Sequence, residues 1–250
     1  LREILRENRV AFGVTVTIGH PDVAEMLGKV GFDYINFDMQ HAPLNIETVQ
    51  MMMQALGGSQ STPIVRVPWN DYALINSALD AGAQGIIIPF VNTREDLERA
   101  IRAASYPPKG IRSYGPRRAS LIYPDYVSTS NEEILVMPQI ETKEALENLN
   151  EDILSVEGVE VFFVGPYDLS MSLGVFAQWD HPIMEKALTK IIEVAESCGK
   201  KAGLLAPIED VGKTLKRGFK LITIGRDFGY LMQAATESLQ KAKSLVSCQR

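Results

Sequence analysis

The stretch 134–170 decides the predicted fold: it holds ILVMPQIET at 134–142 and VEVFFVGPYDLS at 159–170, joined by a short helical pattern. Both segments are apolar runs of strand type, and they end in the carboxylates Glu141 and Asp168. Because the carboxyl ends of neighbouring parallel strands face the same way, these acids are expected to converge on one pocket. A divalent cation would neutralise both carboxylates. The alternative is that one acid caps a helix and the other lies in a turn.

The rest of the chain repeats the same alternation of strand and helix patterns. Eight apolar runs begin at Ala11, Phe32, Pro63, Gly85, Ile134, Val159, Lys201 and Leu221. Between them, apolar residues recur at three- and four-residue spacing, as in amphipathic helices. Eight such units without a linker predict an α/β fold, a (β/α)8 TIM barrel forming one domain over residues 1–250. A doubly wound sheet is the alternative, but TVTIGHPD after the first strand is not a glycine-rich phosphate loop.

Composition excludes several classes of function. The net charge of −6 gives no basic surface for nucleic acid, and no run of 18 apolar residues predicts a membrane span. The first ten residues, LREILRENRV, are charged and unlike a secretion signal. The only two cysteines, Cys198 and Cys248, suggest neither a zinc site nor a disulfide framework. A reducing cytoplasm is therefore the expected location.

One connection is longer than the others and carries unusual residues. Residues 105–131 read SYPPKGIRSYGPRRASLIYPDYVSTSN, rich in proline, glycine, tyrosine and arginine. Loops of this length are usually functional or disordered, and the aromatic and arginine content argues against disorder. We expect this segment to cover a pocket or a neighbouring subunit.

Several polar residues lie where the barrel prediction places chemistry, at the carboxyl ends of the strands. His41 follows the second strand beside Asp38, and a histidine with a pKa near neutrality is suited to act as a base. Arg66 interrupts an apolar strand and predicts either a structural ion pair with Asp38 or Glu141 or a clamp for a carboxylate or enolate. Gln139, in the fifth predicted strand, is a further polar residue at this end of the barrel.

Two further segments bear on the mechanism. In GPYDLS, Gly165 and Pro166 predict a tight turn whose next amides, at Tyr167 and Asp168, face a bound anion. Lys143 is the only lysine near a pocket-side strand end, so metal chemistry is favoured over a Schiff base. Asp80, at a helix end, predicts a solvated surface acid from its position alone.

Taken together, these segments resemble a known family. FDMQHAP, VRVPWND, LDAGAQGIIIPFV, YPPKGIRSYGPRRA, MPQIET and VEGVEVFFVGPYDLS are similar, in this order, to the HpcH/HpaI aldolases. These are class II pyruvate aldolases with a (β/α)8 barrel. The resemblance implies cleavage of a 4-hydroxy-2-oxo acid to pyruvate and an aldehyde, with Mg²⁺ or Mn²⁺, and Co²⁺ as a further option. It also implies a homohexamer whose last helix is exchanged between subunits.

The resemblance assigns roles residue by residue. It makes Glu141 and Asp168 the metal ligands and His41 the base. Asp80 becomes the acid that raises the basicity of that histidine, from the same or a neighbouring subunit. Arg66 stabilises the enolate, while Gln139 and the backbone at Tyr167, together with Asp168, hold the pyruvate moiety.

The sequence departs from the family at one position. Gln40 stands where many members have Glu, next to His41, so one negative charge is missing beside the metal region. Two alternatives stay open: a lyase acting on an acyl-CoA of the malyl-CoA or citramalyl-CoA type, and a non-enzymatic barrel that retains the scaffold. The aldehyde partner, stereochemistry and metal preference are not predicted.

Overall fold

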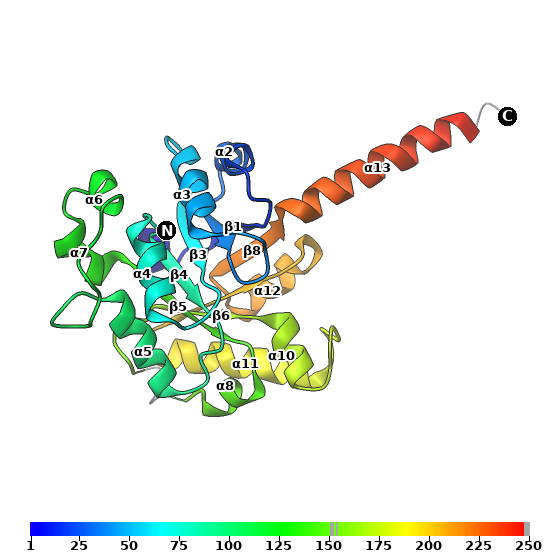
Figure 1. Cartoon of the computed structure of the whole chain (residues 1–250). Helices are drawn as coiled ribbons and strands as arrows, with labels where there is room; N and C mark the ends of the chain where they lie inside the picture. The colour runs from blue at the N-terminus through cyan, green and yellow to red at the C-terminus, as the bar shows by residue number, and fades with distance from the viewer. Residues whose placement is uncertain (151–152, 154, 248–250) are drawn as a thin grey trace.

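The computed structural model describes residues 1–150, 153 and 155–247, and its centre is a closed barrel of eight parallel strands (Figure 1). Each strand pairs with the next along the chain, and β1 pairs with β8. The strands are β1 Ala11–Val16, β2 Tyr34–Asp38, β3 Thr62–Arg66, β4 Gly85–Ile88, β5 Leu135–Ile140, β6 Val161–Val164, β7 Lys201–Leu205 and β8 Leu221–Arg226. The predicted (β/α)8 barrel and its eight strands are confirmed.

Helices connect the strands and surround the barrel. They are α1 Arg2–Arg6, α2 Pro21–Val30, α3 Ile46–Ala55, α4 Tyr72–Asp80, α5 Arg94–Ala104, α6 Ala119–Ile122, α7 Tyr126–Glu133, α8 Lys143–Asn148, α10 Pro166–Ser172, α11 Pro182–Ser197, α12 Val211–Arg217 and α13 Asp227–Ser247, with a 3₁₀ turn η1 at Ile208–Asp210. Side-chain caps fix where several begin: Asp71 accepts from two amides of α4, and Thr93 forms a capping box with Asp96. Gly31 and Gly218 end α2 and α12 with positive φ.

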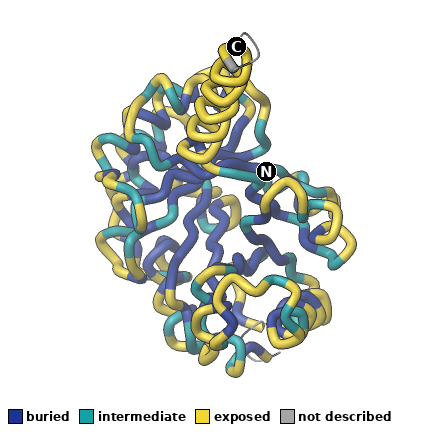
Figure 2. Tube along the Cα trace, turned by 90° about the vertical axis from the view of Figure 1, so that its right-hand side faces the viewer, coloured by how far each residue is buried: buried dark blue, intermediate teal, exposed yellow. Residues whose placement is uncertain are grey.

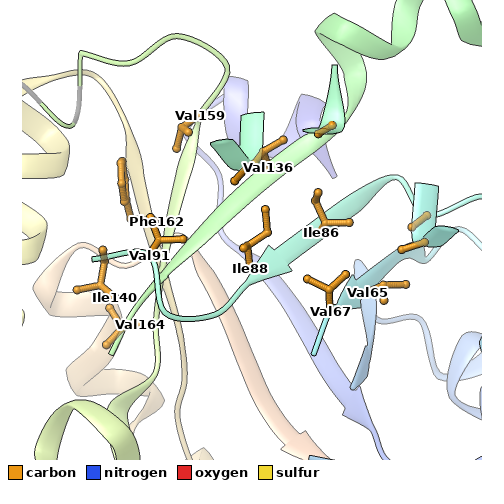
Figure 3. Close-up of a cluster of buried hydrophobic side chains, with 14 of the residues drawn as sticks. Val65, Val67, Ile86, Ile88, Val91, Val136, Ile140, Val159, Phe162 and Val164 are labelled. Atoms are coloured by element: carbon orange, nitrogen blue, oxygen red, sulfur yellow. The ribbon is translucent and has the colours of Figure 1, made fainter. Parts of the chain in front are cut away.

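The larger apolar core lies between the barrel and the helices. Figure 3 shows the part contributed by the outer faces of β3 to β6, where Val65, Ile86, Ile88, Val136 and Phe162 pack together. These residues alternate with inward-facing ones along each strand, as the two-residue repeat of a strand requires. The outer core therefore fixes the register that aims the remaining side chains into the barrel.

A second, smaller apolar core fills the amino-terminal half of the barrel interior. Its buried members are Leu5, Ala11, Tyr34, Ile64, Ile87, Leu135, Met137, Val161, Phe163 and Leu221. Helix α1 contributes Leu5, with Leu1 and Ile4 packed beside it, and so closes this end. Most strand residues are buried, as Figure 2 shows. Apolar packing thus fills the amino-terminal half of the interior, and a cavity opens at the carboxyl ends of the strands.

The long connection 105–131 packs along α4: at the start of that helix the Tyr72 hydroxyl donates to the carbonyl of Ile111 at 3.1 Å. The Tyr126 hydroxyl donates to the carbonyl of Leu79, and Nη1 of Arg118 donates to the carbonyl of Ala81 at 2.6 Å. Both acceptors belong to the C-terminal end of α4, which lies beside the amino ends of the strands. Within one chain this connection therefore packs against α4, and none of its residues lines the cavity at the carboxyl ends of the strands.

Helix α13 leaves the barrel and extends away from it (Figure 1). Its first residue, Asp227, is buried and accepts hydrogen bonds from the amides of Thr17 and Ile18, which ties the start of the helix to the end of β1. From Phe228 to Val246 every residue is exposed, including Leu231, Leu239 and Leu245 (Figure 2). Exposed apolar surface of this extent is typical of interaction sites.

Candidate active site

A cavity of about 250 Å³ opens at the carboxyl ends of the strands. It is lined by Thr15, Asn36, His41, Arg66, Gln139, Phe163, Val164, Gly165, Pro166, Tyr167, Asp168, Leu205 and Arg226. Five of the predicted site residues, His41, Arg66, Gln139, Tyr167 and Asp168, are therefore brought together from segments far apart in the sequence. This end of the barrel is where active sites of the fold are built.

Arg66 is held in place by Asp38 on the neighbouring strand. Its Nε and Nη2 donate to the two carboxylate oxygens of Asp38 at 2.9 and 2.5 Å. Burial by itself would raise the pKa of Asp38, but the hydrogen bonds and charge of Arg66 hold that pKa below its usual value. The ion pair that the sequence offered as one interpretation is thus formed. It uses one edge of the guanidinium, so Nη1 stays available for a ligand in the cavity.

The same carboxylate also shapes the loop that carries His41. Oδ1 of Asp38 accepts the amides of Gln40 and His41 at 3.1 and 3.3 Å. The imidazole of His41 is exposed and lines the cavity. Asp38 therefore fixes the backbone under the histidine and the side chain of Arg66 at once. Oε1 of Gln40 is buried and has no partner among the described residues.

Glu141 is the most deeply buried acid of the site, with 1% of its surface exposed. Its Oε1 accepts the amide of Phe90 at 2.7 Å, and its Oε2 accepts a hydrogen bond from Gln139. Burial raises the pKa of Glu141, and the nearby charge of Asp168 raises it further. The two hydrogen bonds lower this pKa, but the net shift is upward. Phe90 adopts a φ of 53°, a costly conformation for a residue other than glycine. Sequence reasoning gave no role to Phe90, yet its amide orients this carboxylate.

Asp168 meets Glu141 because the chain passes close to the end of β5. A Cβ at Gly165 would lie 2.9 Å from both the Cβ of Glu141 and Nε2 of Gln139, so only glycine fits between β6 and these side chains. The predicted tight turn at Gly165 and Pro166 is in fact the start of α10, with Gly165 as its N-cap. Asp168 follows in the first turn of that helix.

The two carboxylates suit a divalent cation. The charge of Asp168 adds to the rise that burial causes in the pKa of Glu141, which shows that the two carboxylates lie near each other. No cluster of three or more His, Cys, Asp or Glu side chains capable of holding a metal is found among the described residues. A pair of carboxylates with open positions for water and substrate oxygens is the arrangement that Mg²⁺ accepts. The donor set therefore fits a catalytic ion with exchangeable ligands and not a closed structural site.

Tyr167 forms the rim of the cavity next to Asp168. Its ring packs edge-on against Trp179, with centroids 4.9 Å apart, and its side chain is 45% exposed. The aromatic contact holds the first turn of α10 against the segment that precedes α11. The position of the Tyr167 backbone beside the acid is thus set by packing.

Two candidates are not among the residues that line this cavity: Glu141, which is bonded to the lining residue Gln139, and Asp80, which lies far from it. Asp80 ends α4, beside the amino ends of the strands, and its Oδ1 accepts a hydrogen bond from Nη2 of Arg112 at 2.6 Å. Arg112 is completely buried between Tyr106 and Tyr126. Within a single chain, Asp80 therefore belongs to the far end of the barrel from His41.

Sequence reasoning missed three polar residues that line the cavity. Thr15 and Asn36 form its floor, with Nδ2 of Asn36 donating to Oγ1 of Thr15 at 3.3 Å. Arg226 lines the side formed by β8. The signal for Asn36 was present, since it is a polar residue in the apolar run FDYINFDM two residues before Asp38.

Comparison with known proteins identifies the family to which this site belongs. The model of the HpcH/HpaI aldolase/citrate lyase family matches residues 12–234, which includes all eight strands except the first residue of β1. The chain belongs to this family.

Named relatives extend over nearly the whole length of the chain. The 5-keto-4-deoxy-D-glucarate aldolase of Citrobacter koseri is 38% identical over 242 residues, covering 95% of this chain and 93% of the relative. A family protein from Burkholderia cenocepacia J2315 has 30% identity, covers 97% of this chain and 98% of its own, and superposes with a TM-score of 0.91. The citrate synthase SbnG, also 30% identical, covers 99% of this chain and 98% of its own with a TM-score of 0.89.

These likenesses confirm the predicted family and the predicted class of enzyme, a carbon–carbon lyase. The citrate synthase SbnG has the same fold, so the fold by itself does not specify the substrate. No helix among the described residues is long and apolar enough to cross a membrane.

Proposed function

We propose that this HpcH/HpaI-family protein cleaves a 4-hydroxy-2-oxo acid into pyruvate and an aldehyde with the help of a divalent cation. The observation that carries the proposal is that buried Glu141 lies near Asp168, which lines the same cavity as Arg66 and His41. The named aldolase relatives support the same reaction. 5-Keto-4-deoxy-D-glucarate contains the 4-hydroxy-2-oxo acid unit when its carbons are counted from the keto end.

Glu141 and Asp168 would hold the cation, for which Mg²⁺, Mn²⁺ and Co²⁺ are the candidates. When bound, the ion supplies positive charge to the 2-oxo and carboxylate oxygens of the substrate. Arg66 donates from Nη1 to the oxygen at which the enolate charge develops, while Asp38 keeps the guanidinium from moving. Gln139 and the backbone at Tyr167 hold the pyruvate half.

His41 acts as the base. It takes the proton from the C4 hydroxyl, the C4–O bond becomes a carbonyl, and the C3–C4 bond breaks with its electron pair passing to the enolate of pyruvate. Protonation of C3 then gives pyruvate. The exposed imidazole at the rim is placed to return its proton to solvent between turnovers.

The assembly we propose is a homohexamer with α13 exchanged between subunits. The exposed apolar residues of α13 support this arrangement, since a neighbouring subunit would cover them. In such an assembly Asp80 would reach the His41 of another subunit and raise its basicity, a role that it cannot fill from the far end of its own barrel. The protein acts in the cytoplasm as one domain spanning residues 1–250, on small molecules only.

The test is release of pyruvate from 5-keto-4-deoxy-D-glucarate and from shorter 4-hydroxy-2-oxo acids. Prolonged dialysis against EDTA should abolish pyruvate release, and Mg²⁺, Mn²⁺ or Co²⁺ should restore it. Full activity after chelation would overturn the metal-dependent mechanism. Cleavage of malyl-CoA or citramalyl-CoA in preference to the free acids would favour the acyl-CoA lyase instead.

A further inference from the structure

Arg226 occupies a place in the cavity that a regular strand would not give it. Leu221 and Thr223 of β8 face the barrel interior, where Thr223 bonds to Tyr34. Simple alternation would next place Gly225 inward and Arg226 outward. The pairing of β8 with β1 shifts, however: Thr223 lies opposite Gly13, and Arg226 lies opposite Thr15. This bulge brings Arg226 into the row of the inward-facing Thr15, as bulges beside active sites often do.

A glycine stands directly before Arg226 and is closely packed. A Cβ at Gly225 would lie 2.4 Å from the hydroxyl oxygen of Tyr230, in the first turns of α13. Glycine therefore lets the ring of Tyr230 pack directly against β8 beside the bulge. Arg226 itself lines the same cavity as His41, Arg66 and Asp168.

The charge of Arg226 is not balanced within the chain. Among the described residues, its side chain makes no ion pair or hydrogen bond and is exposed. Arg66, by contrast, is paired with Asp38, and Glu141 and Asp168 would be matched by a divalent cation. Arg226 is thus the positive charge of the cavity that is free to bind the anionic group of a ligand.

The cavity continues past Arg226 into a wider hollow of about 560 Å³. Tyr167, Leu205 and Arg226 line both spaces, so they are joined at this point. Ile208, Ile224 and Tyr230 form part of the outer wall. Glu209 also lines the hollow, but it forms no ion pair with Arg226. There is therefore room for a substrate longer than pyruvate, with a cationic group where the two spaces meet.

The order of the strands indicates the direction in which a substrate would extend through this space. Arg66, Glu141 and Asp168, which hold the pyruvate half in the proposed function, belong to β3 and to the ends of β5 and β6. Arg226 ends β8, which is two strands from β6 and three from β3 and β5 around the closed ring. A substrate fixed at the first group would extend its aldehyde half toward the second.

We propose that Arg226 selects substrates whose aldehyde half ends in an anion, a carboxylate or a phosphate, by binding that group. This inference rests on the proposed function, because it takes the direction of the substrate from the pyruvate-binding residues. A guanidinium is suited to this task because it binds either anion through two parallel hydrogen bonds.

The experiment compares aldehydes in the condensation direction, with pyruvate and Mg²⁺ or Mn²⁺. Succinate semialdehyde is matched with neutral butyraldehyde, and D-glyceraldehyde 3-phosphate with D-glyceraldehyde. In Arg226→Met, kcat/KM for the preferred anionic aldehyde should fall by about tenfold to a hundredfold, while the value for its neutral partner changes less than about twofold. Arg226→Lys should keep part of the preference. The anionic aldehyde whose kcat/KM falls more, the carboxylate or the phosphate, identifies the anion that Arg226 binds.

Arg99→Met provides the matched control, because Arg99 lies on α5 and is paired with Asp96 at the surface. Exchange of the pyruvate methyl protons for deuterium, followed by NMR without any aldehyde, reports enolate formation alone. It should be the same in wild type, Arg226→Met and Arg99→Met. Absence of exchange in the wild type would refute the proposed function. Normal exchange with equal losses for anionic and neutral aldehydes in Arg226→Met would refute the role of Arg226.

Discussion

The two halves of the barrel interior are built from the same strands but have different roles: one stabilises the fold and the other carries the candidate active site. In β2 the inward-facing residues are Tyr34, Asn36 and Asp38, and in β5 they run from Met137 to Gln139 and Glu141. The amino-terminal half is apolar and closed by α1, whereas the carboxyl-terminal half carries the ion pair, the acids and the cavity. Along one strand, residues that stabilise the fold and residues that belong to the site are thus only two positions apart. Damage to one half should leave the other nearly intact, and this can be tested.

The largest effect is expected from Glu141→Gln, which keeps the shape of the side chain but removes its charge. Loss of the cation would cost about a thousandfold in kcat/KM, equivalent to about 4 kcal/mol. Stability should not fall. Because burial raises the pKa of Glu141, its ionised form destabilises the metal-free protein at pH above that pKa. The metal-free variant should melt at the same or a higher temperature at pH 8, which calorimetry in EDTA would measure. A clear decrease in that temperature would contradict the separation of the two halves.

Asp38→Asn should lower both stability and activity, because Asp38 lies where the apolar and polar halves of the barrel interior join. It leaves the guanidinium of Arg66 without its buried partner, at a cost of about 3–5 kcal/mol in the free energy of unfolding. It also releases Arg66 and the backbone of His41, so kcat/KM should fall at least about tenfold.

The pH dependence of this variant has a defined sign. The pKa of Asp38 in the folded protein is held below the ordinary value of 3.8. The pair therefore contributes its full stability above that value and loses it as the pH falls through the lower, folded-state pKa. The difference in unfolding free energy between wild type and Asp38→Asn should shrink as the pH is lowered below 3.8. A constant difference across that range, in urea titrations, would show that the pair contributes through packing alone.

Ile64→Ala tests the apolar half directly. Ile64 is completely buried, two residues before Arg66 on the same strand. Removal of its side chain should cost about 2–5 kcal/mol through lost burial and the cavity left behind. Below the melting transition, kcat/KM should change less than about threefold, since Arg66 is still held by Asp38. A loss of activity as large as that of Asp38→Asn would mean that the halves are coupled.

The smallest effect is expected from Tyr34→Phe. The hydroxyl of Tyr34 bonds to Oγ1 of Thr223 at 2.8 Å inside the barrel. Its removal should cost about 1 kcal/mol and leave the kinetics unchanged. Tyr34→Ala would serve as the disruptive comparison, because the ring fills the space beside Gly13, where a Cβ would lie 2.3 Å from it.

The sequence predicted the fold well because the strands and helices repeat a regular pattern. The strand ends of β2, β3, β5 and β6 led directly to His41, Arg66, Glu141 and the start of α10, since a parallel barrel gathers those ends. The exposed apolar face of α13 agrees with the exchange of this helix that the family resemblance implies, which stays a prediction.

What the sequence did not predict depends on local irregularity. Arg226 enters the cavity only through a bulge, and simple alternation argues against it. The bond from Phe90 to Glu141 requires a positive φ at a phenylalanine, which no residue pattern indicates. Asp80 faces Arg112 within the chain, so its predicted role depends on contacts between subunits that periodicity does not describe.

The central claim is that Glu141 and Asp168 together bind one divalent cation. The most direct measurement is titration of the metal-free protein with Mn²⁺, followed by electron paramagnetic resonance of the free ion. Wild type should bind one Mn²⁺ per chain, and both Glu141→Gln and Asp168→Asn should lose that site while Arg99→Met keeps it. Undiminished binding of one Mn²⁺ per chain in both carboxylate variants would contradict the account.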